Sequence, residues 1–579
     1  MSQAGQHDVP LRTIYRQLYR EKFWADVEAG VTKPFVLPLY IAGILIIPAL
    51  YLSIPHKDRP WLYRARWPLL ALLTAFHAYV IRNVSSMNFA AAYGAGLIAS
   101  WGIIWNFALL VWTRPQWDAK RVHIRRKARK ETTQKLANGD ITHDSATPPH
   151  IGNGDTKANG QGATSKDLRK RQTRAKEDAA AAAAAAVPDQ TASTADLSQE
   201  YEYYWQEYPA DASFWTRLDW VLALVTNVRM TGWNWAIPCL PPYEPPPYVG
   251  DVQLPLSSGV HSSRQGFTRA LTRRQLLFSR LFGSIVPSYL VLDFCIVATS
   301  ADPYFLLGPS YRERGVPLPA ALASLHPLAL SALRTALAFF AMLAALNLVW
   351  DVWALALAFP LRPLLGPLRS HPWHLPSMTG SFAQVLDRGL AGFWGAWWHQ
   401  TFRFGFAAPA LWLQRRGFLS RSSSSSSFSR LVPPALAFLQ SGLVHAAASA
   451  TTVAPSRWEM PLCFFLCAGA GAVLQARLSA ALRPPLLLLL PLSRPARRAG
   501  NLAFALLWMC ATSWMLVDDF GRCGLFLHDP LPLSVFRPWS ARLGGDPADT
   551  SILRYDPGAA PRWVWVPGRW GWLQSGVAF

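Results

Sequence analysis

Two histidines in apolar surroundings are the strongest candidates for chemistry in this sequence. His445 lies within the run LAFLQSGLVHAAASATTV, and His399 follows the aromatic sequence FWGAWW. A histidine inside a lipid-embedded helix costs free energy, so it usually faces a cavity or a polar partner. An imidazole that titrates near neutrality can take a proton from a hydroxyl group as a general base. Each residue also has a structural interpretation: His445 as a hydrogen-bonding group between helices, and His399 as part of an interfacial aromatic belt.

The residues around His445 are small, and few other polar groups lie in apolar runs. Ser441 and Gly442 precede His445 by about one helical turn, which leaves room for a substrate or for close helix packing. Asp293 is an intramembrane carboxylate and hence a functional candidate, while Asn347 and Asp351 are spaced to hydrogen-bond on one helix face. The sequence contains no Walker A, HExxH or G-x-S-x-G motif, so the chemistry of those motifs is not expected.

Composition indicates that these residues belong to a membrane protein. Hydrophobic residues make up 51% of the 579 residues and charged residues only 16%, below the roughly 25% of soluble domains. The 27 tryptophans suit lipid–water interfaces. We expect an all-α polytopic protein with about eight spans, over residues 35–54, 67–81, 89–112, 277–298, 326–357, 431–453, 460–478 and 501–517.

Polar segments divide these apolar runs. We expect an amphipathic N-terminal segment over 1–32, helices over 33–113, a disordered basic cytosolic insert over 114–200, a membrane domain over 201–520 and a tail over 521–579. Residues 402–413 are apolar but too short to span, which favours a re-entrant or interfacial segment. With a cytosolic insert, the positive-inside rule holds for the later loops. The same layout puts the N-terminus in the lumen, although Arg12, Arg16, Arg20 and Lys22 make it basic.

Neither charge nor cysteine content indicates another class of protein. The net charge of +22 comes mostly from loops between apolar runs, and no RNA-binding signature or zinc-ligand spacing is present, so nucleic acid is not an expected partner. The six cysteines are too few and too scattered for a disulfide framework. Cys463 and Cys467 are spaced on one helix face without further ligands nearby, so we expect them to pack and not to bind metal.

Three blocks together resemble the wax-synthase-like branch of the membrane-bound O-acyltransferase family, especially its fungal members. The block NVRMTGWNW, Asn227–Trp235, is similar to the family's N-x-R-G-x-G-W-x-W pattern, with Met230–Thr231 where glycine is more usual. The block FWGAWWHQTFR, Phe393–Arg403, is similar to F-W-G-R-x-W-H-Q, with Ala396 in place of a basic residue. The block FLQSGLVHAA, Phe438–Ala447, resembles the F-x-x-S-G-x-x-H helix. The resemblance covers roughly residues 200–520.

The resemblance implies a multi-helix fold with a reaction chamber inside an endoplasmic reticulum membrane. Acyl-CoA enters as co-substrate from the cytosol, a lipophilic alcohol enters from the lipid bilayer, and no bound cofactor or metal is implied. His445 corresponds to the general base, and His399 to a second polar residue that orients acyl-CoA or polarises its carbonyl group. The remaining candidate substrate- or CoA-binding residues are Trp398, Arg403, Asn227, Arg229, Trp233 and Ser441.

Several functions stay open at this point. The acceptor is either a long-chain alcohol, giving a wax ester, or a terpenoid or other secondary-metabolite hydroxyl that receives an acetyl group. Acyl-chain length depends on the shape of a tunnel, which composition does not give. Two other classes of protein compete with an active enzyme. One is a non-enzymatic transporter or scaffold. The other is an inactive relative of the enzymes, which is favoured by the departures from the family pattern at Met230 and Ala396.

Overall fold

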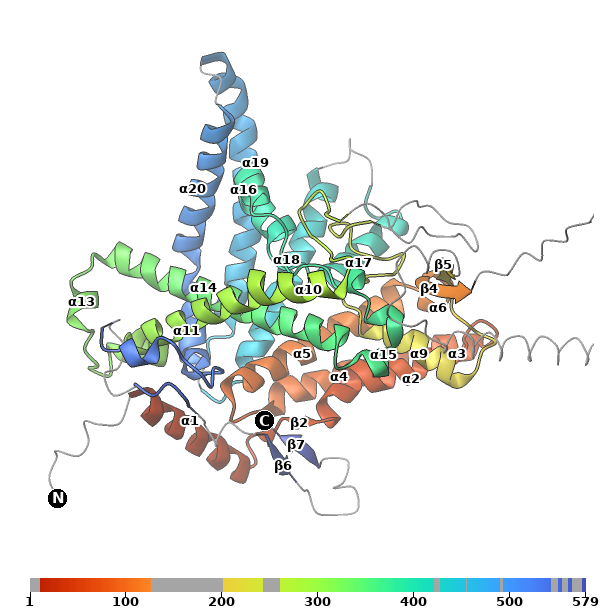
Figure 1. Ribbon diagram of the computed structural model, residues 1–579, viewed down its shortest axis with the longest axis horizontal. Helices are drawn as coiled ribbons and strands as arrows, with labels where there is room; N and C mark the ends of the chain where they lie inside the picture. Colours follow the sequence, from red (N-terminus) through yellow and green to blue (C-terminus); the bar gives the residue numbers. More distant parts are fainter. Residues whose placement is uncertain are drawn as a thin grey trace, which may run out of the picture. The chain divides into compact units, whose positions relative to one another are not determined.

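The computed structural model is built almost entirely of helices (Figure 1) and describes residues 11–126, 201–242, 261–420, 427–454, 456–489, 493–542, 550–554, 561–564 and 575–578. Met1–Arg121, Gln206–Pro242 and Gly259–Phe579 form one compact unit, and Val122–Trp205 with Tyr243–Ser258 form a second. The insert predicted over 114–200 lies outside the described residues from 127 onward, as do the serine run at 422–426 and much of the tail.

Five helical segments of the described chain are long and apolar enough to cross a membrane. A sixth, α20 (Arg494–Thr512) followed by α21 (Trp514–Arg522), is bent by 41°. All six coincide with predicted spans, so a multi-pass helical membrane protein is confirmed. The first two are Phe89–Trp112, made of α5 (Phe89–Phe107) and η4 (Ala108–Trp112), and Arg273–Ser300, made of α10 (Arg273–Arg280), η5 (Leu281–Ile285) and α11 (Val286–Ser300). The other three are Pro327–Ala358 (α14), Phe428–Ala450 within α18 (Ser427–Ala450) and Glu459–Ala481 within α19 (Glu459–Leu489).

The first two predicted spans do not form comparable helices. The apolar run at 35–54 is divided into strand β2, a short 3-10 turn, a π-helical turn and α2, and its helical part covers only Leu39–Leu52. Helix α4 (Arg66–Asn83) contains 18 residues but does not reach the hydropathy of the other segments. Arg66 and Arg82 lie within it and lower its mean hydropathy. The estimate of eight spans is therefore not supported by the described chain.

The remaining elements are short. The other helices are α1 (Leu11–Glu28), α3 (Pro60–Arg64), α6 (Pro115–Asp118), α9 (Phe214–Val225), α12 (Pro303–Leu307), α13 (Ala320–Ala323), α15 (Arg362–Arg369), α16 (Ala383–Gly392) and α17 (Arg403–Arg415). Single turns are η2 (Leu39–Ile41), η3 (Ala42–Ile46), η6 (Gly308–Tyr311), η7 (Pro372–His374), η8 (Phe393–Trp397), η9 (Leu525–Leu527) and η10 (Arg537–Trp539). At 13 residues, α17 is too short to span, as the sequence indicated.

Short strands, which the sequence did not indicate, pair in three places. Strand β1 (Lys33–Pro34) pairs with β3 (Val84–Ser85), and β4 (Arg121–Arg126) pairs with β5 (Tyr201–Gln206). Strand β7 (Gly576–Ala578) lies between β2 (Val36–Leu37) and β6 (Arg562–Val564) in a three-stranded sheet. This sheet joins the C-terminal residues to the start of the first apolar run.

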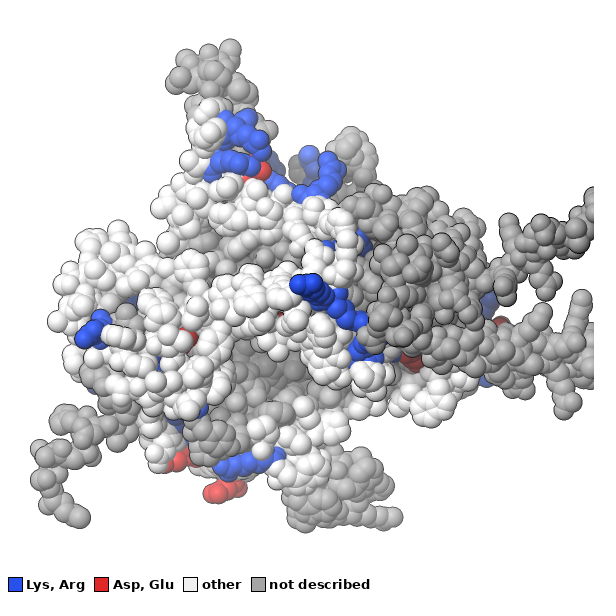
Figure 2. Space-filling model, viewed as in Figure 1, with Lys and Arg blue, Asp and Glu red and all other residues white. Residues whose placement is uncertain are grey.

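The surface has the charge distribution of a membrane protein. On the face that Figure 2 shows, most of the described surface is uncharged, and Lys and Arg gather near the upper end of α20 and in the middle of the view. Many large apolar side chains are exposed, including Leu328, Val349 and Leu507, each more than 70% accessible. Exposed apolar surface on this scale marks contact with lipid or protein.

Helix α1 buries its arginines and exposes apolar side chains. Arg12 and Arg16 are 3% and 7% exposed, while Ile14 and Leu18 are 39% and 50% exposed. The buried face carries Tyr19 and Phe23 as well, and the arginines donate to the carbonyl oxygens of Phe526, Leu527 and His528 beside η9. The positive charges of Arg12 and Arg16 therefore lie inside the protein and not in an exposed basic loop. Because the positive-inside rule concerns exposed loops, its conflict with a lumenal N-terminus is smaller.

Asp529 is the shared partner of four arginines. Its Oδ2 atom lies 4.0 Å from Arg12 Nη1, 3.8 Å from Arg16 Nη2, 3.5 Å from Arg537 Nη2 and 3.4 Å from Arg554 Nη1. Burial raises the pKa of Asp529, but the four guanidinium groups outweigh it and hold the pKa below its usual value. One carboxylate thus joins α1 to the tail.

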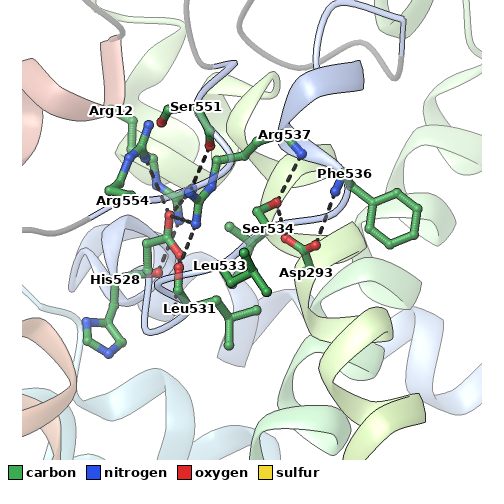
Figure 3. A network of polar contacts seen from close by, with 12 residues as sticks. Arg12, Asp293, His528, Leu531, Leu533, Ser534, Phe536, Arg537, Ser551 and Arg554 are labelled. Atoms are coloured by element: carbon green, nitrogen blue, oxygen red, sulfur yellow. Dashed lines mark hydrogen bonds and ion pairs between the residues drawn. The ribbon is translucent and has the colours of Figure 1, made fainter.

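A second network anchors the tail to α11 (Val286–Ser300), and Figure 3 shows both networks close together. Asp293 is fully buried and accepts hydrogen bonds from Ser534 Oγ and from the amides of Val535 at 2.7 Å and Phe536 at 3.2 Å. These three donors satisfy the carboxylate. Asp293, a functional candidate in the sequence, therefore holds the tail in the structure.

Asp351 has a partner different from the expected one. Its Oδ1 atom lies 3.3 Å from Arg280 Nη1, on the helix that precedes the π-helical turn η5 (Leu281–Ile285). Among the described residues no hydrogen bond joins Asp351 to Asn347, and the carboxylate instead lies against the guanidinium group of Arg280, which supplies an opposite charge.

Replacing Asp529 with Asn should destabilise the protein by about 3–5 kcal/mol, because four guanidinium groups lose the carboxylate that they share in a buried site. Thermal unfolding of the detergent-solubilised protein measures the change. Asp387→Asn is the matched control, because Asp387 pairs with Arg498 on the exposed surface and its loss should have little effect. Equal melting temperatures for Asp529→Asn and wild type would contradict the role of this cluster.

Candidate functional site

The site is built where α18 packs against α5 and α19. A Cβ atom placed on Gly96 of α5 would lie 2.1 Å from the carbonyl oxygen of Ala447 in α18, so only glycine permits this approach. Thr451 Oγ1 fixes the contact by donating to Ala92 O at 2.7 Å and accepting from Gly96 N at 3.1 Å. Small residues bring helices together in this way in membranes.

This close approach gives His445 a partner on α5. Tyr93, about one turn before Gly96, places its hydroxyl oxygen 2.9 Å from Nδ1 of His445. On the other side, the ring of Phe465 from α19 stacks on the imidazole with centroids 4.6 Å apart and planes at 15°. Two elements thus fix the orientation of the ring. Nδ1 is occupied, and Nε2 makes no hydrogen bond to the described residues.

His399 lies in a turn that two neighbouring side chains hold. The preceding turn η8 is π-helical and ends at Trp397. Gln400 Nε2 donates to the carbonyl oxygens of Trp394 and Trp398 at 2.9 and 2.8 Å, and Arg403 Nη1 donates to Gly395 O at 2.6 Å and to Gln400 Oε1 at 2.8 Å. Neither ring nitrogen of His399 has a hydrogen-bond partner in the described part of the chain.

Burial, followed by the positive charge of Arg229, lowers the pKa of His399 to about 4. The ring is therefore neutral at pH 7, with one N–H to donate and one lone pair to accept a hydrogen bond. His399 and His445 lie within electrostatic reach of each other. The fold thus brings the two histidines from separate blocks of sequence to one place.

A series of aromatic rings runs between the two histidines. Trp398 lies 5.4 Å from His399 and 6.2 Å from Trp394, measured between ring centroids. Trp394 lies 5.7 Å from Phe465, which stacks on His445. Trp398 also stacks on Phe393 at 5.5 Å. These rings give the region between the imidazoles an apolar wall suited to a lipophilic group.

The block at Asn227–Trp235 forms a tight turn and part of a core. Asn227 Oδ1 accepts from Thr231 N at 3.0 Å, and its Nδ2 donates to Thr231 O at 2.7 Å. Within this turn, Met230 has φ of 53°, a left-handed conformation that glycine adopts more readily. This explains why glycine suits the position, and the fully buried Met230 side chain belongs to the same hydrophobic core as Trp220 and Trp233.

The predicted site residues therefore divide into two groups. Asn227, Trp233 and Arg403 make contacts that hold turns or core, while Ser441 makes no side-chain hydrogen bond to the described residues. Trp398 lies against His399. Arg229 from the same block as Asn227 is buried, at 2% exposure, and its charge reaches His399. Among the described residues, no three His, Cys, Asp or Glu side chains are grouped to hold a metal ion.

Tyr93 and Phe465 were missed at the level of sequence. Both occur in apolar runs, where a single tyrosine or phenylalanine is ordinary. The only available signal was that Tyr93 precedes Gly96 by about one turn in FAAAYGAG, a stretch of small residues typical of a helix interface. That signal indicates close packing but does not name the helix on the other side.

The geometry can be compared with known proteins. Residues 375–467 match the model of the Membrane bound O-acyl transferase family. A segment of 90 residues is 36% identical to Acetyltransferase nanB of Aspergillus nanangensis. The matched segment makes up 15% of this chain and 20% of that protein. The chain thus matches about a fifth of the length of this relative. No solved structure matches the chain.

The two similarities are therefore to the Membrane bound O-acyl transferase family over one segment and to part of an acetyltransferase. The matched segment contains His399, His445 and Phe465, together with the whole of η8 and α17. Tyr93 and the block at Asn227–Trp235 lie outside it. The part of the chain that is matched is therefore the part that carries both imidazoles.

The buried histidines should make stability fall in mild acid. The pKa values of His371, His374 and His399 are lowered to about 3, 4 and 4, first of all by burial. The unfolded chain binds these protons below about pH 6.5, whereas the folded chain does not, so stability is present above that pH and is lost as pH falls toward about 4.

His399→Gln should make this loss smaller, because one of the imidazoles that the fold keeps neutral is then absent. Melting temperatures of wild type and variant at about pH 7 and about pH 5 measure the difference. His261→Gln is the control, since His261 is exposed and the loss should match that of wild type. An unchanged loss in His399→Gln would show that His399 is not kept neutral by the fold.

Proposed function

We propose that this chain is an acyl-CoA-dependent O-acyltransferase of the endoplasmic reticulum membrane, of the wax-synthase-like branch of its family. It transfers an acyl group from acyl-CoA to the hydroxyl group of a lipophilic alcohol. The observation that carries the proposal is that one segment, matched by the family model, supplies both His399 and His445, whose imidazoles lie within electrostatic reach.

In this proposal, Nε2 of His445 accepts the proton of the alcohol as its oxygen attacks the thioester carbon. The new C–O bond forms while the carbonyl π electrons move to oxygen, giving a tetrahedral oxyanion. When the oxyanion collapses, the C–S bond breaks and CoA leaves as thiolate, which takes the proton from the imidazolium. The products are an ester and CoA, and no metal or covalent enzyme intermediate is needed, since the thioester is already activated.

The contacts of the two imidazoles suit these roles. With Nδ1 of His445 donating to the Tyr93 oxygen, the Nε2 lone pair is available for the alcohol proton, and Phe465 keeps the ring from rotating. Tyr93 is thus a positioning residue. Neutral His399 donates its N–H to the acyl-CoA, and the rings of Trp394 and Trp398 exclude water from the thioester.

Acetyl-CoA is the first donor to test. The relative with a matching segment is named an acetyltransferase, which favours a short acyl group, and the acceptor is then a terpenoid or other secondary-metabolite hydroxyl. The second donor to test is a fatty acyl-CoA, offered with a long-chain alcohol so that the product is a wax ester. In both cases the alcohol reaches the site from the bilayer, which the apolar surfaces of the spanning helices contact.

His445→Ala should lower the rate of ester formation by about 10²–10⁴-fold, because the general base is lost. Microsomes from yeast that express the chain are offered radiolabelled acetyl-CoA or palmitoyl-CoA with fatty and terpenoid alcohols. Labelled ester is measured at equal protein level.

His261→Ala is the matched control, because this histidine is exposed and outside the matched segment. It should retain the wild-type rate. Equal rates for wild type and His445→Ala would exclude His445 as the base. No ester from wild type with any pair would favour the competing functions, a transporter, a scaffold or an inactive relative.

Tyr93→Phe should lower kcat by about 10–100-fold with little change in KM, because the imidazole loses the hydroxyl that orients it but the substrate contacts remain. The melting temperature should change little, since one net hydrogen bond contributes only about 1 kcal/mol. Steady-state kinetics with wild type and the variant measure the split between kcat and KM. A wild-type kcat in Tyr93→Phe would contradict the positioning role.

A further inference from the structure

Arg229 is the buried charged group that the reaction outlined above leaves unused. Its side chain is 2% exposed, and its guanidinium group lies over the rings of Trp350 at 4.8 Å and Phe267 at 5.5 Å. Nη2 donates to the carbonyl oxygen of Ser377 at 2.9 Å. The buried Nε and Nη1 atoms have no hydrogen-bond partner in the described part of the chain.

The charges around Arg229 do not balance. Asp351 is 3.3 Å from Arg280, and Arg229 forms no ion pair with any carboxylate of the described residues. Arg229 and Arg280 thus place two positive charges near one carboxylate, that of Asp351. One positive charge in this buried region is therefore not neutralised. Burial, the largest influence, lowers the pKa of Arg229 to about 10, so the group is still protonated at pH 7.

An arrangement of this kind is costly in the unliganded protein. An orphaned buried N–H group costs free energy, and an unbalanced buried charge costs more. A hydrophobic residue of similar length would fill the space at lower cost, so the arrangement is of use only if an oxygen atom with negative charge reaches Nε and Nη1. The phosphates of CoA, which carry several charges, are better suited to exposed basic residues than to a guanidinium group enclosed by two rings.

The position of Arg229 indicates which oxygen this is. Phe267, under its guanidinium group, also lies against Gly380, whose amide donates to the carbonyl oxygen of Trp397 at 3.1 Å, two residues before His399. The charge of Arg229 also contributes to the lowered pKa of His399. Ser377, whose carbonyl oxygen it contacts, belongs to the same matched segment as the two histidines. Negative charge develops there at one atom in acyl transfer, the carbonyl oxygen of the thioester.

We infer that Arg229 is a second donor to the acyl carbonyl oxygen and acts with His399 to stabilise the oxyanion, an inference that rests on the proposed function. Donors fixed in a water-poor site act most strongly on the charge that develops in the transition state. Arg229 thus acts on kcat more than on the binding of acyl-CoA.

Arg229→Met tests the inference, because it removes the donors while retaining length and apolar contact. The kcat for ester formation should fall by about 10²–10³-fold with the acyl-CoA KM within about threefold of wild type. The melting temperature should be unchanged or higher, since an unbalanced buried charge is removed. Arg229→Lys, which keeps the charge, should retain more activity than Arg229→Met.

Arg280→Met is the matched control. Arg280 is also buried, but it pairs with Asp351 and donates to Leu375 O at 3.1 Å, so its loss should lower the melting temperature. If Arg229→Met lowers the melting temperature as much as Arg280→Met does, Arg229 is structural and the inference is wrong. The inference would also be wrong if Arg229→Met had the kcat of wild type, whether or not its KM for acyl-CoA were raised.

A measurement without turnover separates this inference from the proposed function. Infrared difference spectra of acetyl-CoA labelled with ¹³C at the carbonyl, bound without an alcohol, report hydrogen bonding to that oxygen. The carbonyl stretch should move to lower frequency on binding to wild type and return toward the free value in Arg229→Met. A frequency shift that depends on Arg229, with no ester formed from any alcohol, would support the role of Arg229 and contradict the proposed transferase. Ester formation without such a shift would support the transferase and contradict the role of Arg229.

Discussion

The apolar surroundings of the spanning helices are the constraint on which this structure depends. A charged or polar side chain in such surroundings must find its partners within the protein, since neither water nor lipid supplies them. Asp302 accepts two hydrogen bonds from Arg334, at 2.6 and 2.8 Å, and Arg280 pairs with Asp351. Each of these pairs joins segments that are distant in sequence, so the polar groups determine which helices become neighbours.

The same constraint separates structural groups from functional ones. Asp293 has three donors, and Asp529 has four guanidinium groups around it, so both are satisfied and both hold the tail. Within the part of the chain that the structure describes, His445 has a partner at Nδ1 only, and Arg229 has two N–H groups without one. A group that remains unsatisfied in an apolar site lowers stability, and a ligand that completes it recovers the loss. The proposed chemistry is located at these incomplete groups.

The sequence was sufficient for much of this account, because its strongest signals are local. Five of the apolar runs become helical segments long enough to span and a sixth becomes a bent pair of helices, and His399 and His445 stand out against apolar neighbours. The division of the first run was not predicted, since the π-helical turn at Ala42–Ile46 leaves hydropathy unchanged. The match over 375–467 supports the family that three blocks of sequence resembled, although not the branch within it.

Contacts between distant segments were the part that sequence did not provide. Tyr93 meets His445 across 352 positions, and the pairing of Asp351 with Arg280 replaced the local one that spacing favoured. Met230, a departure from the usual glycine, proves to occupy a left-handed position whose buried side chain fills the core. Each depends on which helix faces which, and periodicity along one helix does not carry that information.

The most direct test of the central claim is an experimental structure of the protein with an acetyl-CoA analogue whose sulfur is replaced by a methylene group, which prevents release of CoA. The acyl carbon should lie between the imidazoles of His399 and His445, along the rings of Trp394 and Phe465. Its carbonyl oxygen should accept from Arg229 or His399. An acyl group bound away from both imidazoles would contradict the account.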